Sequence, residues 1–225
     1  MDSFTNIESF EIVERLDLKN SDIDAFIKIR DDFYEMKNTY NSAIRELNTK
    51  LEILNDEFKI KYSRNPIHHL QSRLKKPESI IEKLIRKNFK LSMDSAKSNI
   101  TDIAGIRVIC NYIDDIYLIA ELLGNHDDLI IVRERDYINN PKKNGYRSLH
   151  LVIQVPVFFS DRKEFVPVEV QIRTIAMDFW ASLEHHIRYK TEEHIDSEIA
   201  KKLLECAETI SQTDLKMQEI YKSSN

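Results

Sequence analysis

Two acidic residues stand in segments that are otherwise strongly apolar. Asp102 opens the segment DIAGIRVICNYI, and Glu169 lies in the middle of EFVPVEVQIR. A carboxylate beside a buried strand is costly unless it is paired or binds a cation. Two carboxylates from neighbouring strands suit Mg²⁺, which prefers oxygen ligands and shares its coordination shell with substrate phosphates. A carboxylate in such a position could also take a proton from a hydroxyl group.

The same two carboxylates have a structural interpretation as ion pairs. Asp102 could pair with Arg107, and Glu169 could pair with Arg173, each a few residues away along the chain. Spacing alone favours these ion pairs over a metal site, because a charge near a buried strand is most simply explained by a partner.

Basic side chains are concentrated in two parts of a chain whose formal net charge is −5. The group that precedes the predicted sheet comprises Arg73, Lys75, Lys83, Arg86 and Lys87. The later group comprises Arg133, Arg135, Lys142, Lys143 and Arg147. On a helix, Ser79 would share a face with Lys83 and its basic neighbours. Such clusters bind polyphosphates and stabilise charge in phosphoryl transfer, although an ordinary solvated surface is the alternative.

The stretch NPKKNGYRSLH contains Gly145, one of three glycines in the chain. Asn144 and Gly145 predict a turn, because both residue types tolerate a positive φ angle. This turn would present the ring of Tyr146 at the start of a strand, exposed and with cations on both sides. An aromatic ring beside phosphate-binding cations suits a stacked nucleobase. The alternative is a plain hairpin turn with a packed tyrosine.

Two predicted strands, residues 146–157 and 164–173, must position most of these groups. Because strand side chains alternate between faces, each of these strands has an apolar and a polar face. The apolar faces comprise Leu149, Leu151, Ile153 and Val155, and Val166, Val168, Val170 and Ile172. The polar faces comprise Tyr146, Ser148, His150 and Gln154, and Phe165, Glu169, Gln171 and Arg173. We therefore expect a sheet with one face buried under helices and the other equipped for chemistry.

Helical segments flank this sheet. Residues 1–65 contain neither Gly nor Pro and carry an apolar stripe of helical spacing. Residues 198–221 carry another stripe, which comprises Ile199, Leu203, Cys206, Ile210 and Met217. Asn65 and Pro66 predict the start of one helix, and Pro77 predicts the start of the next. The predicted organisation is a helical extension (1–64), a core (65–190) and a C-terminal helix (191–225) that serves oligomerisation.

The middle of the chain changes from helical to strand periodicity. Residues 102–113 predict a strand, a short helix follows to Gly124, and residues 129–135 predict a further strand. The sequence therefore indicates an α/β (α+β) fold.

Composition excludes several classes of protein. The two cysteines are far apart, which argues against a disulfide framework. Neither a signal peptide nor a membrane span is readable, so we expect a cytoplasmic protein. The negative net charge makes nucleic acid an improbable main ligand. Neither a P-loop nor a Rossmann glycine motif occurs.

Five segments together resemble the synthetase domain of the RelA/SpoT family over roughly residues 65–190. They are DIAGIRV, RERDYI, PKKNGYRSLH, VEVQIRT and FWASLEH. The chain is most similar to the stand-alone small alarmone synthetases of the RelP type. The resemblance implies a nucleotidyltransferase-like fold with a mixed sheet of about five strands, flanked by N- and C-terminal helices. It also implies a homotetramer and synthesis without hydrolysis.

The activity implied by the resemblance is transfer of the β,γ-diphosphate of ATP to the 3′-hydroxyl of GDP or GTP, with release of AMP. Asp102 and Glu169 would hold Mg²⁺, and Glu169 would also be the base. ATP would be bound by Arg73, Lys75, Ser79, Lys83 and Arg107. GDP or GTP would be bound by Arg133, Arg135, Lys142, Asn144, Tyr146, His150, Gln171 and Asp178.

Three other functions compete with this expectation. A nucleotidyltransferase of related fold would release pyrophosphate instead of AMP. An RNA-binding module would show a steep dependence of affinity on salt. In a pure scaffold, the carboxylates would only form structural ion pairs.

Overall fold

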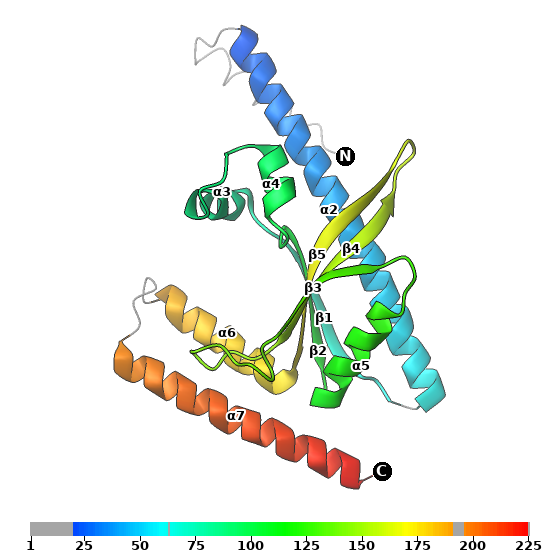
Figure 1. Ribbon diagram of the computed structural model, residues 1–225, viewed down its shortest axis with the longest axis vertical. Helices are drawn as coiled ribbons and strands as arrows, with labels where there is room; N and C mark the ends of the chain where they lie inside the picture. Colours follow the sequence, from blue (N-terminus) through cyan, green and yellow to red (C-terminus); the bar gives the residue numbers. More distant parts are fainter. Residues whose placement is uncertain (1–19, 63, 191–195, 225) are drawn as a thin grey trace, which may run out of the picture. The chain divides into compact units, whose positions relative to one another are not determined.

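The computed structural model describes residues 20–62, 64–190 and 196–224 (Figure 1). The chain divides into two compact units, residues 1–39 and 40–225. In the first unit, the described residues form the beginning of helix α2 (Asn20–Tyr62). The account below concerns the second unit. Parts of the predicted N-terminal extension and C-terminal segment, residues 1–19, 191–195 and 225, lie outside the described residues.

The described residues form six helices and five strands. After α2, the elements are β1 (Ile67–Leu74), α3 (Pro77–Arg86), α4 (Met93–Asn99), β2 (Ala104–Cys110), α5 (Ile113–Gly124), β3 (Ile130–Asp136), β4 (Leu149–Phe158), β5 (Lys163–Thr174), α6 (Ile175–Lys190) and α7 (Ser197–Ser223).

The five strands form one mixed sheet in the order β1-β2-β5-β4-β3. Strands β2 and β5 are parallel, and every other neighbouring pair is antiparallel. The predicted mixed five-stranded sheet between helices is therefore confirmed. The parallel pair is central, so the side chains of β2 and β5 have strands on both sides.

One face of the sheet is the apolar core. Leu151 and Ile153 of β4 and Val168 and Val170 of β5 are fully buried, as their alternation predicts. Helix α5 contacts β2 and β5. The side chain of Ser72 in β1 points to this apolar face, and Asn48 of α2 donates a hydrogen bond to it. The later part of α2 therefore lies on the same face. The helices therefore leave the other face of the sheet for the polar side chains.

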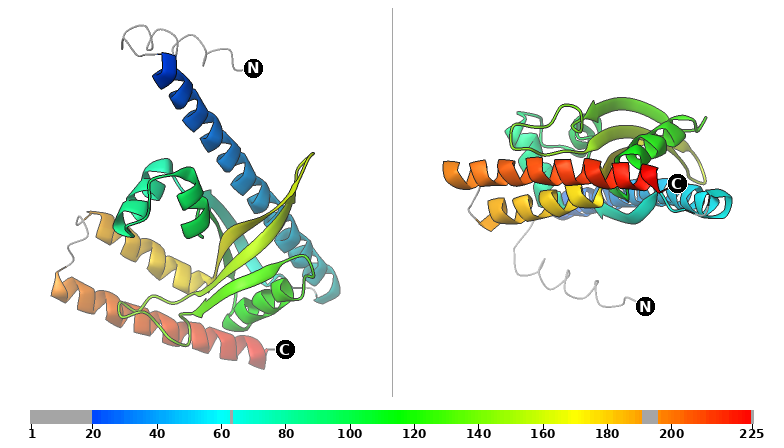
Figure 2. Two further views of the ribbon diagram at one scale, coloured as in Figure 1. Left: turned by 45° about the horizontal axis from the view of Figure 1, so that its top comes forward. Right: turned by 90° about the horizontal axis from the view of Figure 1, so that it is seen from below.

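Helices α6 and α7 pack against each other and against the loop before β4. Figure 2 shows the two helices side by side. Trp180 of α6 donates a hydrogen bond from Nε1 to the carbonyl of Leu203 at 2.9 Å, and Ala207 of α7 is buried beside it. The predicted apolar stripe of α7 is partly wrong, because Ile199 and Met217 are exposed. The packed side of the helix instead includes buried Asp214 and Gln218.

The helix predicted to begin at Pro66 is wrong. Residues Ile67–Leu74 form β1, which pairs with β2 along its whole length. The carbonyl of Pro66 accepts a hydrogen bond from the backbone of Asn111 at 3.2 Å, so Pro66 stands just before a strand, where its missing N–H is tolerated. Pairing with a distant strand overrides the local capping signal. Arg73, expected to precede the sheet, consequently lies within it.

Other boundaries follow the expected pattern with small shifts. Helix α3 begins at Pro77 and β3 covers Ile130–Asp136, which confirms both predictions. Asp102 stands two residues before β2 and does not open the strand. Similarly, β4 begins at Leu149, so Tyr146 lies in the preceding loop.

Candidate active site

The register of the sheet aligns polar side chains in two rows across its open face. The first row runs through one residue of each strand: Gln71, Arg107, Gln171, His150 and Arg135. The second row runs through Arg73, Gly105, Glu169, Val152 and Arg133. Register partners point to the same face of a sheet, so residues far apart in the sequence meet here. This brings the predicted ATP-binding and acceptor-binding residues onto one surface.

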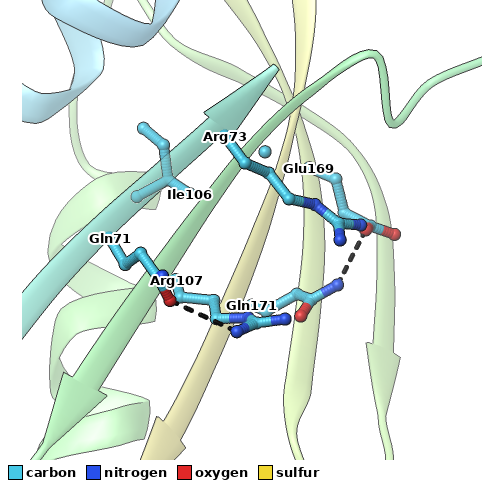
Figure 3. A pocket seen from close by; sticks show the side chains of 7 residues that line it. Gln71, Arg73, Ile106, Arg107, Glu169 and Gln171 are labelled. Atoms are coloured by element: carbon cyan, nitrogen blue, oxygen red, sulfur yellow. Dashed lines mark hydrogen bonds between the residues drawn. The ribbon is translucent and has the colours of Figure 1, made fainter. Parts of the chain in front are cut away.

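A pocket lies on this surface over β1, β2 and β5. Its lining comprises Gln71, Arg73, Gly105, Ile106, Arg107, Glu169 and Gln171 (Figure 3). Arg107 donates a hydrogen bond to Gln71 at 3.2 Å, and Gln171 donates one to Glu169 at 2.9 Å. Each hydrogen bond joins two strands or two rows, so these side chains hold one another in position.

Arg73 of β1 crosses over Gly105 of β2 toward β5. A Cβ atom at Gly105 would lie 3.5 Å from Cγ and 3.6 Å from Nε of Arg73. Arg73 therefore crosses directly above the glycine, and Figure 3 shows its guanidinium pointing toward Glu169. A larger side chain at position 105 would occupy the space that the arginine uses. The guanidinium of Arg73 and the carboxylate of Glu169 therefore lie above the same part of the open face.

Glu169 is ionised by its surroundings. Burial by itself raises the pKa of this carboxyl, but the interactions with His150 and Gln171 outweigh burial and lower the pKa below its usual value. His150 Nδ1 lies 3.7 Å from the Glu169 carboxylate, and its Nε2 lies 2.8 Å from Tyr146 Oη. A continuous polar chain therefore joins the carboxylate to the tyrosine.

Asp102 is paired with two lysines. Lys75 Nζ lies 2.8 Å from Oδ2, and Lys83 Nζ lies 2.7 Å from Oδ1. Burial by itself raises the pKa of Asp102, but the interactions with Lys75 and Lys83 outweigh burial and lower the pKa below its usual value, which favours the ionised carboxylate. The ion pairs are therefore not those expected from spacing: Asp102 pairs with lysines, and Arg173 pairs with Asp178 at 3.2 Å.

Asp102 and Glu169 fit a divalent cation whose remaining ligands would come from the substrate. The charge of Asp102 acts on Glu169 and opposes its ionisation, so the two groups lie within electrostatic range. Among residues 20–62, 64–190 and 196–224, no group of three or more His, Cys, Asp or Glu side chains is arranged to hold a metal. Two carboxylates leave other coordination positions of the metal open. This suits Mg²⁺, which keeps waters and phosphate oxygens in its shell.

The loop that carries Tyr146 is fixed to the C-terminal helices. Gly145 has a φ of +90°, and a Cβ there would lie 2.5 Å from the Cβ of Ala207 in α7. Asn144 donates a hydrogen bond to Glu184 of α6 at 3.0 Å. Arg147 donates to the carbonyls of Gly145 and Ala207. The predicted turn is confirmed, and its glycine is needed both for φ and for contact with α7.

The ring of Tyr146 is not exposed as predicted. It makes edge contacts with Tyr137 and His150, and Lys142 Nζ lies 4.6 Å from the centres of the Tyr137 and Tyr146 rings. Burial raises the pKa of Tyr146. The neighbouring rings cover much of the tyrosine because Tyr137 at the end of β3 folds against it. Of the cations predicted on both sides of the ring, Lys142 lies beside it, whereas Arg147 donates to backbone carbonyls.

Other predicted site residues lie around this surface. Ser79 lies in the first turn of α3, one turn before Lys83. Arg133 donates a hydrogen bond to Thr101 at 2.7 Å, and Arg135 lies 3.5 Å from the Tyr137 hydroxyl. Both arginines are exposed on β3. They remain available to a ligand at the far end of both rows.

Sequence reasoning missed two residues of this site. Arg173 is 2% exposed, and burial lowers its pKa, with Arg107 and Arg73 contributing by charge repulsion. The sequence did offer a signal for Arg173: it alternates with Glu169 and Gln171 along one strand, so all three side chains point to the same face. Gln71 shares a face with Arg73, but this becomes readable only once β1 is known to be a strand.

The fold and the site define an α+β protein with a sheet face that carries carboxylates, arginines and lysines suited to nucleotide phosphates. Residues 72–194 match the region found in RelA / SpoT proteins, and the chain belongs to this family. Among the described residues, no helix is long and apolar enough to cross a membrane.

Known proteins resemble this chain over most of its length. It is 44% identical over 207 residues to the GTP pyrophosphokinase YwaC of Bacillus subtilis, covering 92% of this chain and 99% of that relative. The crystal structure of small alarmone synthetase 2 from B. subtilis matches with a TM-score of 0.79 and 46% identity, over 85% of this chain and 99% of that one. The crystal structure of small alarmone synthetase 1 of the same organism, bound to its product pppGpp, matches with a TM-score of 0.76 and 36% identity. The match covers 82% of this chain and 93% of that one.

Proposed function

We propose that this chain is a GTP diphosphokinase that transfers the β,γ-diphosphate of ATP to the 3′-hydroxyl of GDP or GTP. The products are AMP and ppGpp or pppGpp, the alarmones of the stringent response. The observation that carries the proposal is the second row of the sheet, where Glu169 stands beside Gly105 with Arg73 crossing above. A carboxylate next to a guanidinium on an open polar face supports the proposal. The pyrophosphokinase name of the 44% identical relative supports the same reaction.

The ATP side of the site lies over β1, β2 and α3. Arg73 and Arg107 present planar guanidinium groups from adjacent strands, which suits an adenine between them. Lys75, Ser79 and Lys83 would bind the phosphates. Asp102 and Glu169 would hold Mg²⁺. When bound, Mg²⁺ would neutralise charge on the transferred phosphates.

The acceptor side lies over β3, β4 and the loop before β4. Tyr146 and Lys142 would hold the guanine and its phosphates, and His150 and Gln171 lie between this region and Glu169. Arg133 and Arg135 would bind phosphates from β3. Asn144 and Asp178 belong to the same proposed subsite, although each already has a partner, Glu184 and Arg173 respectively.

The proposed reaction is an in-line displacement at the β-phosphorus. The 3′-oxygen of the acceptor forms a bond to the β-phosphorus, and the bond from that phosphorus to the bridging oxygen of AMP breaks. Glu169 receives the hydroxyl proton. Its lowered pKa keeps it ionised and able to accept the proton at neutral pH.

The test is a product analysis. Purified protein is mixed with Mg²⁺, ATP and either GDP or GTP, and the nucleotides are resolved by anion-exchange chromatography. AMP formed in equal amount with a more highly phosphorylated guanosine nucleotide is the expected result. Release of pyrophosphate without AMP would instead indicate a nucleotidyltransferase. No turnover by folded protein would contradict both the diphosphokinase and the nucleotidyltransferase activity.

We further propose a cytoplasmic homotetramer with a synthetase core at 65–190 and no hydrolase activity. Exposed apolar side chains on α6 support self-association: Ile175, Phe179 and Leu183 are 45%, 59% and 48% exposed and are spaced at one helical turn. Light scattering coupled to size-exclusion chromatography measures the assembly. A monomeric mass at micromolar concentration would contradict it.

A further inference from the structure

Asp102 and the lysines proposed to bind ATP phosphates are bound to each other. Lys75 follows β1 and Lys83 lies on α3, so the two cations reach one carboxylate from different elements. The carboxylate thus faces a lysine at each oxygen. We call these three residues the Asp102 cluster. Without nucleotide, the proposed metal ligand is therefore held by the proposed phosphate ligands.

The Asp102 cluster is shielded from water. The side chains of Asp102, Lys75 and Lys83 are 13%, 15% and 23% exposed. The backbone N–H of Lys75 donates a hydrogen bond to the carbonyl of Ile103 at 2.8 Å, which fixes Lys75 beside Asp102. Charges at such low exposure interact more strongly than surface pairs, and removing the partners of one of them is costly.

Metal-free nucleotide therefore meets a barrier at this site. Its phosphates could recruit Lys75 and Lys83 only by leaving Asp102 as a poorly solvated carboxylate beside further negative charge. Asp102 already acts on Glu169 as a like charge. A divalent cation carried by the nucleotide removes this cost, because it offers Asp102 a positive partner as the lysines turn to the phosphates.

We infer that the Asp102 cluster is a specificity device that makes the ATP site select the metal complex of the nucleotide over the metal-free nucleotide. The inference rests on the proposed function, since it assumes that ATP binds here. Asp102 then has two alternating sets of partners. In the free protein it positions Lys75 and Lys83, and in the complex it faces the metal.

The experiment measures binding and not turnover. The probe is an ATP analogue with a methylene bridge between the α- and β-phosphates, which cannot transfer its diphosphate. Isothermal titration calorimetry gives its Kd in Mg²⁺ and in EDTA for the wild type, for Asp102→Asn and for Glu169→Gln. The last variant is the matched control, because it also removes one negative charge from the site but frees no lysine.

The expected result is a gain of metal-free binding in one variant only. Asp102→Asn should bind the analogue in EDTA about tenfold more tightly than the wild type, whereas Glu169→Gln should change by about threefold or less. The preference of Asp102→Asn for Mg²⁺ over EDTA should shrink correspondingly. Equal gains in both variants, or no gain in Asp102→Asn, would overturn the inference.

A double-mutant cycle provides a second measurement. Lys83→Ala should weaken metal-free binding more in the Asp102→Asn background than in the wild type, because only there is Lys83 free to bind phosphate. Additive effects would overturn the inference. Thermal unfolding of each variant shows that it is folded. Failure of the wild type to bind the analogue in Mg²⁺ would contradict the proposed function itself, and so the two failures are distinguishable.

Discussion

His150 of β4 lies diagonally across from Glu169 of β5, with 3.7 Å between Nδ1 and the carboxylate. The interaction with His150 is the largest of the effects that lower the pKa of Glu169 against its burial. The lowered pKa means that Glu169 stays ionised at neutral pH and becomes protonated only as the pH falls through that value. The histidine thereby sets the acid limit of a reaction that uses Glu169 as base.

Replacing His150 with alanine should therefore move the acidic limb of the kcat/KM profile to higher pH. The pKa of Glu169 rises when the interaction with the imidazole is lost, so the base is protonated at a higher pH on acidification. The measurement is kcat/KM against pH for the wild type and the variant. Gln154→Ala, further along the same face of β4, is the control. An acidic limb at the same pH in His150→Ala would contradict the role given to the histidine.

Glu169→Gln should abolish diphosphate transfer while nucleotides still bind. The amide cannot accept the hydroxyl proton, and loss of a general base costs about 10³-fold in rate. AMP release reports turnover, and calorimetric titration with the ATP analogue reports binding. Turnover near that of the wild type would show that another group acts as base. A change in stability alone would indicate a structural carboxylate.

Tyr146 should act through its ring and its hydroxyl in separable ways. Tyr146→Phe keeps the ring but removes the 2.8 Å contact with His150, so we expect a lower kcat with a nearly unchanged KM for GDP. Tyr146→Ala removes the stacking surface and should raise that KM by about tenfold, since base stacking contributes about 1–3 kcal/mol. Steady-state kinetics with GDP as the varied substrate measures both. Equal KM values for the two variants would contradict a stacking role.

Gly145→Ala should lower the free energy of unfolding by about 2–3 kcal/mol. The new methyl group would meet Ala207 at 2.5 Å, and the φ of +90° strains any residue with a Cβ. Chemical denaturation measures the change. Gly124→Ala is the matched control, because its Cβ would only make an ordinary contact with Ile131 at 3.5 Å. Adding Ala207→Gly to Gly145→Ala should recover part of the loss, and equal stability of the two glycine variants would contradict the steric explanation.

Alternation along β4 and β5 was enough to predict the two faces of the sheet. Leu151 and Val170 are buried and Glu169 and His150 are on the polar face, because a period of two depends only on local sequence. The register between neighbouring strands could not be predicted in this way. The meeting of Arg73 with Glu169 needs β1 to pair with β2 and β2 with β5, which are contacts between distant segments.

The errors of sequence reasoning have the same physical origin. Pro66 carries a helix-start signal, but pairing with β2 decides that segment in favour of a strand. The expected partners of Asp102 were close in sequence, whereas the lysines that bind it come from other elements. Arg173 was placed on the polar face as a partner of Glu169, but it is buried and pairs with Asp178 of α6 instead.

The contact between Gly145 and Ala207 bears on how small a working enzyme of this kind can be. The segment that defines the family ends at residue 194, whereas α7 begins at Ser197. The loop before β4 rests on Glu184 of α6, inside the family's shared region, and on Ala207 of α7, outside it. A protein cut at the family boundary would keep every proposed catalytic residue and lose the α7 part of the support of its proposed guanine subsite. Divergence in this last helix is accordingly a route by which relatives could change acceptor preference without altering a residue that touches substrate.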